Sequence, residues 1–246
     1  MKSILNISAY RFVSLSETAH WRDSIHAQAQ SASLKGTVLL AEEGINLFLA
    51  GAEQDVRGFL QWLTSHEAFF GLEGKESWSE TAPFGKLLVK VKPEIIRMNH
   101  PMIRPQSGRA PAVDAATLMR WLDAGVDDNG REVVTLDTRN AFEVDHGRFR
   151  GAHDWRIDKF SEFPDALREH VADLEGKTVV SYCTGGIRCE KAALLMAEAG
   201  IQNVLQLEGG ILKYFEVTGG KHFEGNCFVF DERRILDDTL AQARSV

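Results

Sequence analysis

The N-terminal part of the sequence switches repeatedly between two hydrophobic periods. Four apolar or alternating runs of the kind found in β-strands lie at 4–13, 36–41, 45–50 and 84–91. Apolar residues recur at helical spacing at 16–32, where Ser16 is expected to cap the helix, and at 52–66. The order β-α-β-β-α-β predicts a ferredoxin-like split βαβ domain at 1–98.

The pattern changes at 99–112, where prolines and glycines interrupt a polar, basic stretch and predict a linker. Beyond a short helix ending near Ala124, three apolar strand-like runs lie at 133–136, 179–180 and 204–207. The helical stretches between these runs predict a parallel sheet covered on both faces. We therefore expect an α/β protein whose second domain occupies 113–224, followed by a C-terminal extension at 225–246.

Composition narrows the class of protein. The chain has 246 residues, of which 44% are hydrophobic, enough for two packed cores. No apolar run approaches the roughly 20 residues that cross a membrane, and the N-terminus does not resemble a secretion signal, so we expect no membrane association and a cytoplasmic location. Cys183, Cys189 and Cys227 have no paired spacing, and the histidines share none. This argues against a disulfide framework and against a metal site.

Charge is distributed unevenly. The net charge of −7 argues against a largely basic, nucleic-acid-binding surface, yet the stretch 86–109 holds one acid, Glu94, among many bases. This stretch is either a solvated face or a surface that contacts phosphates. In the second case, the RNA-binding contacts are expected at Lys86, Lys90, Lys92, Arg97 and Arg104. Trp78 and Trp155, which fall near predicted loops, are candidates for base stacking.

One cysteine stands where a predicted strand gives way to a predicted helix. Cys183 follows the apolar run 178–182 and precedes the helix-like stretch 189–196. Unpaired amides and the positive end of the helix dipole favour a thiolate there. The glycines and the arginine of the loop are expected to cradle an anion, so Cys183 is a candidate nucleophile with an exposed side chain. The loop reads Cys183, Thr184, Gly185, Gly186, Ile187, Arg188.

The length of this loop bears on its chemistry. Four residues separate Cys183 from Arg188, fewer than in the loop of tyrosine phosphatases, so a tetrahedral phosphate would be cramped. A terminal sulfur on the cysteine fits better, which favours persulfide chemistry. The alternative is a cysteine packed as a small hydrophobic residue. Cys189 is expected to be structural, although it is also placed to resolve a sulfur adduct on Cys183, and Cys227 is expected in the core.

Two further motifs relate the second domain to a known family. Asp137, Arg139 and Glu143 form the pattern D-x-R-x-x-x-E, and G-x-x-x-G-A follows at 147–152. Together with the six-residue loop, they resemble the rhodanese family over roughly 128–220, so the second domain is expected to be rhodanese-like. We expect the three charged residues to brace the sheet edge beside the loop as an ion-pair network rather than to act directly in catalysis.

A closer resemblance extends over most of the chain. The segments that carry it are 35–46, 182–191, 208–211 and 226–233. Together they resemble the bacterial rhodanese-containing tRNA uridine hydroxylases, which install 5-hydroxyuridine at the anticodon wobble position with molecular oxygen. The resemblance implies the tRNA anticodon region as partner, oxygen as co-substrate and Cys183 as the essential residue, with no cofactor evident. Many members continue into a cysteine-rich tail beyond the position of Val246.

The residues and the resemblance favour different reactions. An anion-cradled cysteine predicts sulfur transfer, whereas the family hydroxylates a pyrimidine carbon, and the sequence shows neither an iron-binding facial triad nor a flavin fingerprint. In a hydroxylase, Cys183 either adds to C6 of uridine or carries a persulfide or oxidised sulfur. A persulfide or thiosulfate sulfurtransferase and a non-enzymatic RNA-binding module are the alternatives. The sequence leaves the oligomeric state open.

Overall fold

The computed structural model describes residues 4–243, which form two compact units. The first unit consists of the N-terminal stretch up to Arg97 together with Phe230–Arg233. The second consists of Met98–Val229 and the residues from Arg234 onward.

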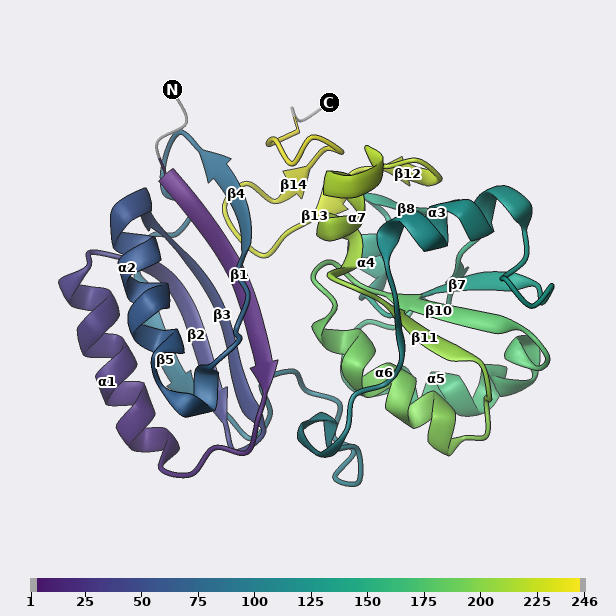
Figure 1. The fold of residues 1–246 in the computed structure, drawn as a ribbon, viewed down its shortest axis with the longest axis horizontal. Helices are drawn as coiled ribbons and strands as arrows, with labels where there is room; N and C mark the ends of the chain where they lie inside the picture. Colours follow the sequence, from purple (N-terminus) through teal and green to yellow (C-terminus); the bar gives the residue numbers. More distant parts are fainter. Residues whose placement is uncertain (1–3, 244–246) are drawn as a thin grey trace. The chain divides into compact units, whose positions relative to one another are not determined.

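The first unit is a mixed sheet with two helices on one face (Figure 1). Its elements are β1 (Ile4–Phe12), α1 (Thr18–Ser31), β2 (Lys35–Ala41), β3 (Gly44–Ala52), α2 (Glu53–Thr64), the 3-10 turn η1 (Glu67–Phe69), β4 (Lys75–Ser79) and β5 (Leu87–Val91). The strand order is β4-β1-β3-β2-β5, and all neighbours are antiparallel except β2 and β5. The predicted ferredoxin-like domain is thereby confirmed.

The closing strand of this domain differs from the prediction. The sequence places it at 84–91, but the strand that pairs with β1 on the far side from β3 is β4. All five residues of β4 are half-buried, and Trp78 is its one large apolar side chain, so the strand gives no alternating signal. The run at 84–91 instead supplies β5, an additional strand beside β2 at the opposite edge.

The first helix begins later than predicted. The chain is still bonded to the turn between β2 and β3 at Leu15, whose amide donates to Glu42 O at 2.9 Å. α1 then begins at Thr18 after Glu17, whose backbone is left-handed at φ 53°, and no side chain caps the helix. Ser16 is therefore not the cap. The helix depends instead on packing, because Ile25 and Ala29 are fully buried against the sheet.

The second unit is a parallel sheet with helices on both faces (Figure 1), as predicted. Its sheet strands are β6 (Ala112–Val113), β7 (Val133–Asp137), β9 (His153–Asp154), β10 (Thr178–Tyr182) and β11 (Val204–Leu207). They run parallel in the order β6-β11-β10-β7-β9. The helices are α3 (Ala115–Ala124), α4 (Ala141–Val144), α5 (Phe163–His170), α6 (Ile187–Glu198) and α7 (Gly210–Thr218). α3 and α7 cover one face, and α5 and α6 cover the other.

Short elements complete this unit. They are the 3-10 turns η2 (Pro105–Ser107), η3 (Phe160–Glu162) and η4 (Val171–Leu174), and the strands β8 (Gly147–Phe149), β12 (Phe223–Gly225), β13 (Cys227–Phe228) and β14 (Ile235–Leu236). β12 pairs with β8, and β13 pairs with β14, both antiparallel. Through β12, the C-terminal part of the chain therefore pairs with β8, which lies near the middle of the second unit in sequence.

Residues 99–112, which the sequence marks as a linker, are partly buried in the second unit. Ile103 and Ala110 lie in its interior. The Gln206 side chain donates from Nε2 to Ala110 O at 3.1 Å, and Arg109 pairs with Glu190 at 2.8 Å. This stretch therefore contributes to the packing around helix α6.

Candidate active site

The candidate nucleophile lies at the carboxyl end of β10, a central strand of the parallel sheet. Cys183 follows the last residue of that strand, and helix α6 begins at Ile187. Gly186 precedes the helix with a φ of 98°, a conformation that glycine adopts without strain. The turn directs its own amide inward, because Gly186 N donates to Cys183 Sγ at 3.1 Å.

The surroundings of Cys183 favour its thiolate. Burial would raise the pKa of this thiol, but hydrogen bonds from Cys189 and the backbone, together with the positive charge of Arg188, outweigh burial and lower the pKa to about 5. The sulfur is therefore negatively charged at neutral pH. This matches the physical basis on which the sequence singled out the loop.

The exposure of Cys183 differs from the prediction. The residue is only 1% exposed, whereas an accessible side chain was expected. The first turn of α7 holds the loop, because Ile211 N donates to Cys183 O at 3.0 Å and Leu212 N donates to Thr184 O at 3.1 Å. Arg188 is also folded back into the protein.

Gly210 allows this close packing. Its backbone is left-handed at φ +65°, and a Cβ at this position would lie 2.4 Å from Cys183 O and 2.8 Å from Gly186 N. Any other residue would push the first turn of α7 off the loop. In the sequence, Gly210 stands out only as part of the family resemblance, because the approach of α7 to the loop is not visible there.

Cys189, in the first turn of α6, forms a pair with Cys183. Burial and the adjacent Cys183 thiolate raise the pKa of Cys189 well above its usual range, so it stays a thiol. The side chain of Thr138 lies on its other side, with Oγ1 3.7 Å from Cys189 Sγ. Thr138 was not predicted, although its place directly after β7, the neighbour of β10, could have indicated it.

The three charged residues of the rhodanese motif take part in two ion pairs, which are linked by a hydrogen bond from Arg139 Nη1 to Glu143 O at 3.4 Å. Arg139 is fully buried and donates to Asp137 from Nη2 at 2.6 Å and to Gly147 O at 2.6 Å. Glu143 instead accepts two hydrogen bonds from Arg188, at 2.6 and 2.8 Å. Burial raises the pKa of Glu143, but the charge of Arg188 outweighs it, and the pKa is lowered. Glu143 thus fixes the position of the Arg188 guanidinium beside Cys183.

The remaining loop residues hold the loop in place. The hydroxyl of Thr184 donates to Phe228 O at 3.3 Å, which ties the loop to β13. Gly185 is half-buried, and Ile187 begins α6 in a buried position. Phe228 was not predicted as part of the site, since nothing in a single sequence reveals that β13 returns to the loop.

The predicted RNA-contacting residues are exposed. Four of them belong to the first unit, and Arg104 belongs to the second. Lys86, Lys90 and Lys92 alternate along β5 and its flanks with Leu87 and Val89, which pack on the core. Because side chains alternate across a strand, the three lysines project from the opposite face. Within residues 4–243, none of the three forms an ion pair.

The other two predicted RNA contacts do not lie on β5. Arg97 ends the first unit. Arg104 belongs to the second unit and donates to Pro101 O at 3.4 Å.

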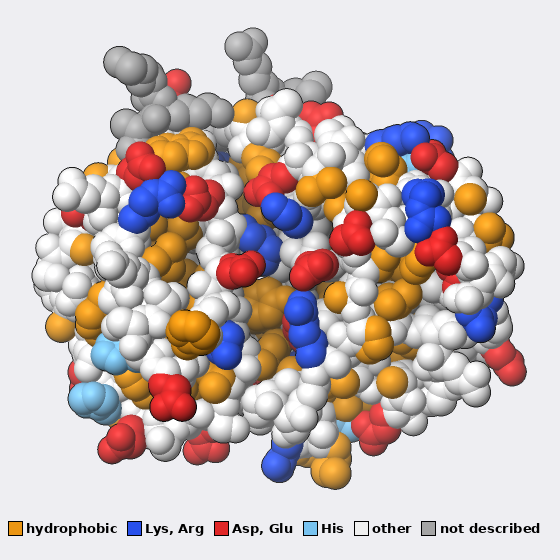
Figure 2. All heavy atoms as spheres, viewed as in Figure 1, with side chains coloured by type: hydrophobic (Ala, Val, Ile, Leu, Met, Phe, Trp, Pro, Cys, Tyr) orange, Lys and Arg blue, Asp and Glu red, His pale blue; other side chains and the backbone are white. Residues whose placement is uncertain are grey.

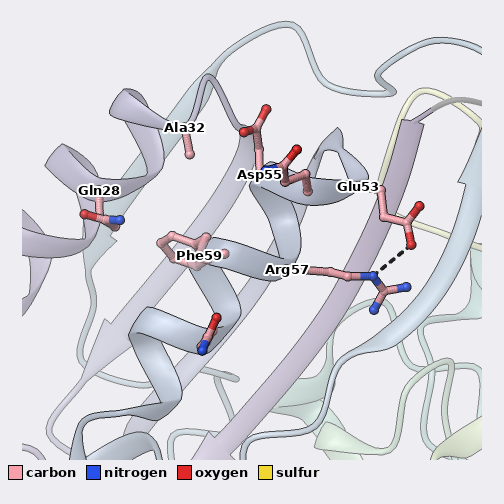
Figure 3. A pocket seen from close by; sticks show the side chains of 9 residues that line it. Gln28, Ala32, Glu53, Asp55, Arg57 and Phe59 are labelled. Atoms are coloured by element: carbon pink, nitrogen blue, oxygen red, sulfur yellow. Dashed lines mark hydrogen bonds and ion pairs between the residues drawn. The ribbon is translucent and has the colours of Figure 1, made fainter.

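A groove lies over the helices of the first unit (Figure 3). It has a volume of about 720 Å³ and is lined by residues of α1 and α2 and by Ala32, which follows α1; the lining includes Gln28, Glu53, Asp55, Arg57 and Phe59. Arg57 is bonded to two carboxylates, Glu53 at 2.9 Å and Glu76 at 2.9 and 3.1 Å. None of the residues predicted to be functional lines this groove.

Two searches of the described residues bear on other classes of site. Within 4–243, no three or more His, Cys, Asp or Glu side chains are arranged to hold a metal ion. No helix in the same range has both the length and the apolar character that a membrane span needs.

Family models match both units of the chain. The UPF0176 acylphosphatase-like domain matches residues 4–95, and the rhodanese-like domain matches residues 118–216. The protein is therefore an acylphosphatase-like mixed sheet joined to a rhodanese-like parallel α/β domain, and the cysteine loop belongs to the latter.

Full-length relatives define the family more closely. A protein of Bordetella petrii is 63% identical over 246 residues, which cover 100% of this chain and 98% of the relative. A protein of Paraburkholderia phytofirmans is 56% identical over 248 residues, covering 99% of this chain and 86% of the relative. Both are named tRNA uridine(34) hydroxylase. The chain belongs to this family and is an enzyme on a rhodanese scaffold.

Similarity to solved structures is partial. The rhodanese-like domain of an Anabaena protein aligns with a TM-score of 0.38 at 24% identity, over 47% of this chain and 79% of that one. An acylphosphatase from Coxiella burnetii aligns with a TM-score of 0.29 at 16% identity, over 36% of this chain and 93% of that one. The fold assignment rests on the family models and the observed sheets rather than on these alignments.

Proposed function

We propose that this enzyme hydroxylates the uridine at position 34, the wobble position of the tRNA anticodon, to 5-hydroxyuridine, and that Cys183 is essential to the reaction. The reaction is the one for which the full-length relatives are named. The observation that favours Cys183 is the 3.1 Å contact from the Gly186 amide to its sulfur, beside the Arg188 guanidinium. This environment stabilises an anionic nucleophile.

In the proposed reaction, the contacts that cover Cys183 must first open, because the residue is only 1% exposed, and its thiolate then adds to C6 of the uracil ring. The C5–C6 π electrons move to C5 and O4, and C5 becomes nucleophilic toward oxygen. Molecular oxygen supplies one atom to C5, and the other leaves as water after two thiols of a cellular reductant become a disulfide and give two electrons and two protons. Loss of the C5 proton and cleavage of the C6–S bond then restore the double bond and the thiolate.

Nucleoside mass spectrometry of tRNA from a deletion strain tests the role of Cys183. Wild-type protein is expected to restore 5-hydroxyuridine, and Cys183→Ser is expected to leave it absent. Cys227→Ser is the matched control, because Cys227 is equally buried but lies on β13 outside the loop. Normal hydroxyuridine in the Cys183→Ser strain would refute the proposed role.

An isotope experiment tests the oxygen source separately. Cells supplied with ¹⁸O₂ in unlabelled water are expected to carry the heavy isotope in the hydroxyl of the modified nucleoside. Unlabelled hydroxyuridine under these conditions would exclude molecular oxygen as the direct donor.

Persulfide or thiosulfate sulfurtransfer is the second candidate, because a thiolate cradled in a small rhodanese-type loop also suits a terminal sulfur. A sulfurtransferase would turn over thiosulfate with cyanide in the absence of RNA, and its deletion would leave tRNA hydroxylation unchanged. A non-enzymatic RNA-binding module would tolerate loss of Cys183. The same strains therefore distinguish the three functions.

We also place the initial tRNA contacts at Lys86, Lys90 and Lys92, with Arg97 and Arg104 as further phosphate contacts. Three lysines on one face of an edge strand suit a polyanion, because such contacts position RNA without reading its sequence.

A further inference from the structure

Three aromatic side chains meet beside the cysteine loop within the second unit. The rings of Phe142 and Phe228 are 5.2 Å apart, centre to centre, and nearly perpendicular at 89°. The rings of His146 and Phe228 are 5.5 Å apart and nearly parallel at 19°. Phe142 belongs to α4, His146 follows that helix, and Phe228 belongs to β13, so two distant segments of the chain form this aromatic cluster.

Phe142 has an unusual position within its short helix. Its neighbours Ala141, Glu143 and Val144 are buried, whereas Phe142 is 45% exposed. An apolar ring that is held by a neighbouring ring and partly exposed offers a flat platform. Its contact with Phe228 limits the motion of the ring, so the ring loses little conformational entropy when a ligand binds.

Both segments that carry the cluster are bonded to the loop itself. Glu143, next to Phe142, holds Arg188 through two hydrogen bonds of 2.6 and 2.8 Å. The carbonyl of Phe228 accepts the hydroxyl of Thr184, the residue after Cys183. A ligand resting on Phe142 would thus lie next to the covering of the reactive sulfur.

Two basic side chains follow His146 closely in the sequence. Arg148, on β8, is 52% exposed, and Arg150, just beyond that strand, is 72% exposed. Their partners are Asp154 at 3.9 Å and Glu224 at 2.9 Å. The Arg150–Glu224 pair is exposed on both sides and is weak enough to be exchanged for a phosphate, whereas the side chain of Asp154 is buried and also bonded to Arg156 at 3.0 Å. An aromatic platform on a segment that also carries an exchangeable guanidinium group matches a nucleotide better than a purely apolar partner.

We propose that Phe142, braced by Phe228 and His146, is a base-stacking subsite that holds an unpaired base of the RNA beside the Cys183 loop. This inference rests on the proposed function for the nature of the ligand. It replaces the two tryptophans suggested from the sequence. Trp155 is stacked on His170 at 5.4 Å, and Trp78 packs against the core of the first unit.

The test uses the full-length chain and an RNA anticodon stem-loop with 2-aminopurine in place of one loop base at a time. Stacking on an aromatic ring is expected to quench the probe's fluorescence in at least one loop position. Phe142→Ala should remove that quenching and weaken binding roughly tenfold, the usual effect of losing one base–aromatic contact. Phe142→Trp should restore both, whereas Phe142→Leu, which keeps the apolar volume without the ring, should not.

The control is Phe70→Ala, the same truncation at an exposed phenylalanine of the first unit. It should leave quenching and affinity unchanged. Equal affinity and quenching in wild type and Phe142→Ala would overturn the subsite, as would an equal loss in Phe70→Ala. Thermal unfolding of each variant separates a binding defect from a folding defect.

This readout is independent of the hydroxylation. Quenching that depends on Phe142, in a protein that forms no hydroxyuridine, would support the subsite and refute the proposed function. Hydroxylation with an unchanged KM in Phe142→Ala would do the reverse.

Discussion

The pKa of the Cys183 thiol is set by a few groups around its sulfur. The Gly186 amide, the Cys189 thiol and the Arg188 charge act against burial, and the anion is the favoured form. Cys189 shows the opposite outcome within the same pocket, since burial and the thiolate beside it keep it protonated. The two sulfurs are therefore in different protonation states at neutral pH, which is the arrangement that a nucleophile and a hydrogen-bond donor require.

The lowered pKa of Cys183 predicts a pH-dependent contribution to stability. An unfolded cysteine has a pKa near 8.5, so the stabilisation is complete above that value and is lost as the pH falls toward about 5. In urea unfolding, the stability advantage of wild type over Cys183→Ser should be larger at pH 9 than at pH 6.

Cys227 supplies the control for this experiment. Burial raises its pKa to about 12, so its contribution is complete below the unfolded pKa and falls as the pH rises. The advantage of wild type over Cys227→Ser should therefore not increase between pH 6 and pH 9. An advantage over Cys183→Ser that is equal at both pH values would contradict the thiolate assignment.

The Glu143–Arg188 pair predicts strong coupling between two residues. Both side chains are buried, so removing one leaves an unpaired charge and should cost about 3–5 kcal/mol of unfolding free energy. Arg188→Met and Glu143→Gln should each destabilise the protein to this degree, while the double variant should recover part of the loss. Chemical denaturation measures all four proteins, and additive losses would show that the pair does not act as a unit.

At the scale of elements, hydrophobic periodicity predicted the helices and the buried strands, because each places apolar side chains at a fixed spacing. It missed β4, whose residues are half-buried and mostly polar, and it assigned the closing position to β5. The periodicity also correctly predicted that Asp137 and the Cys183 loop lie at the ends of strands, and these two strands are neighbours. The pairing of Glu143 with Arg188, the approach of Gly210 and the return of Phe228 depend on tertiary contacts that one sequence does not encode locally.

The contact between α7 and the loop gives a prediction for Gly210. Gly210→Ala adds a methyl group 2.4 Å from Cys183 O in a left-handed conformation, so both strain and overlap oppose it. We expect a loss of about 2–4 kcal/mol of stability, from about 1 kcal/mol of backbone strain plus the overlap, and loss of activity.

Gly200→Ala is the matched control for that variant. Gly200 is also left-handed, at φ +92°, but an added Cβ meets nothing within 4 Å. It should cost about 1 kcal/mol by backbone strain and leave activity unchanged. Similar losses in the two variants would show that the packing of α7 on the loop is unimportant.

At the scale of the whole molecule, negative net charge coexists with local basic surfaces. Figure 2 shows Lys and Arg side chains interspersed with Asp and Glu. Many of them pair, as Arg156 does with Asp145 at 2.7 Å. Lys86, Lys90 and Lys92, on β5 and its flanks, form no such pair within residues 4–243, so their charge is available to a polyanion even though the sum over the chain is −7.

Replacing Lys86, Lys90 and Lys92 by Gln should weaken the salt dependence of tRNA binding. If each lysine contacts one phosphate, the slope of log K against log salt should fall in magnitude by about 2–3. The control changes net charge equally by replacing Lys159, Lys177 and Lys221, which lie near acids of the second unit. Equal slopes for the two triple variants would mean that total charge, not the β5 surface, governs binding.

The pairing of the C-terminal stretch with β8 and the cysteine loop bears on the order in which the fold is completed during synthesis. β12 and β13 follow every strand of both sheets in the sequence, yet they supply the partner of β8 and the carbonyl that receives Thr184. The segments that complete the pocket around the sulfur are therefore synthesised after the strands of both five-stranded sheets.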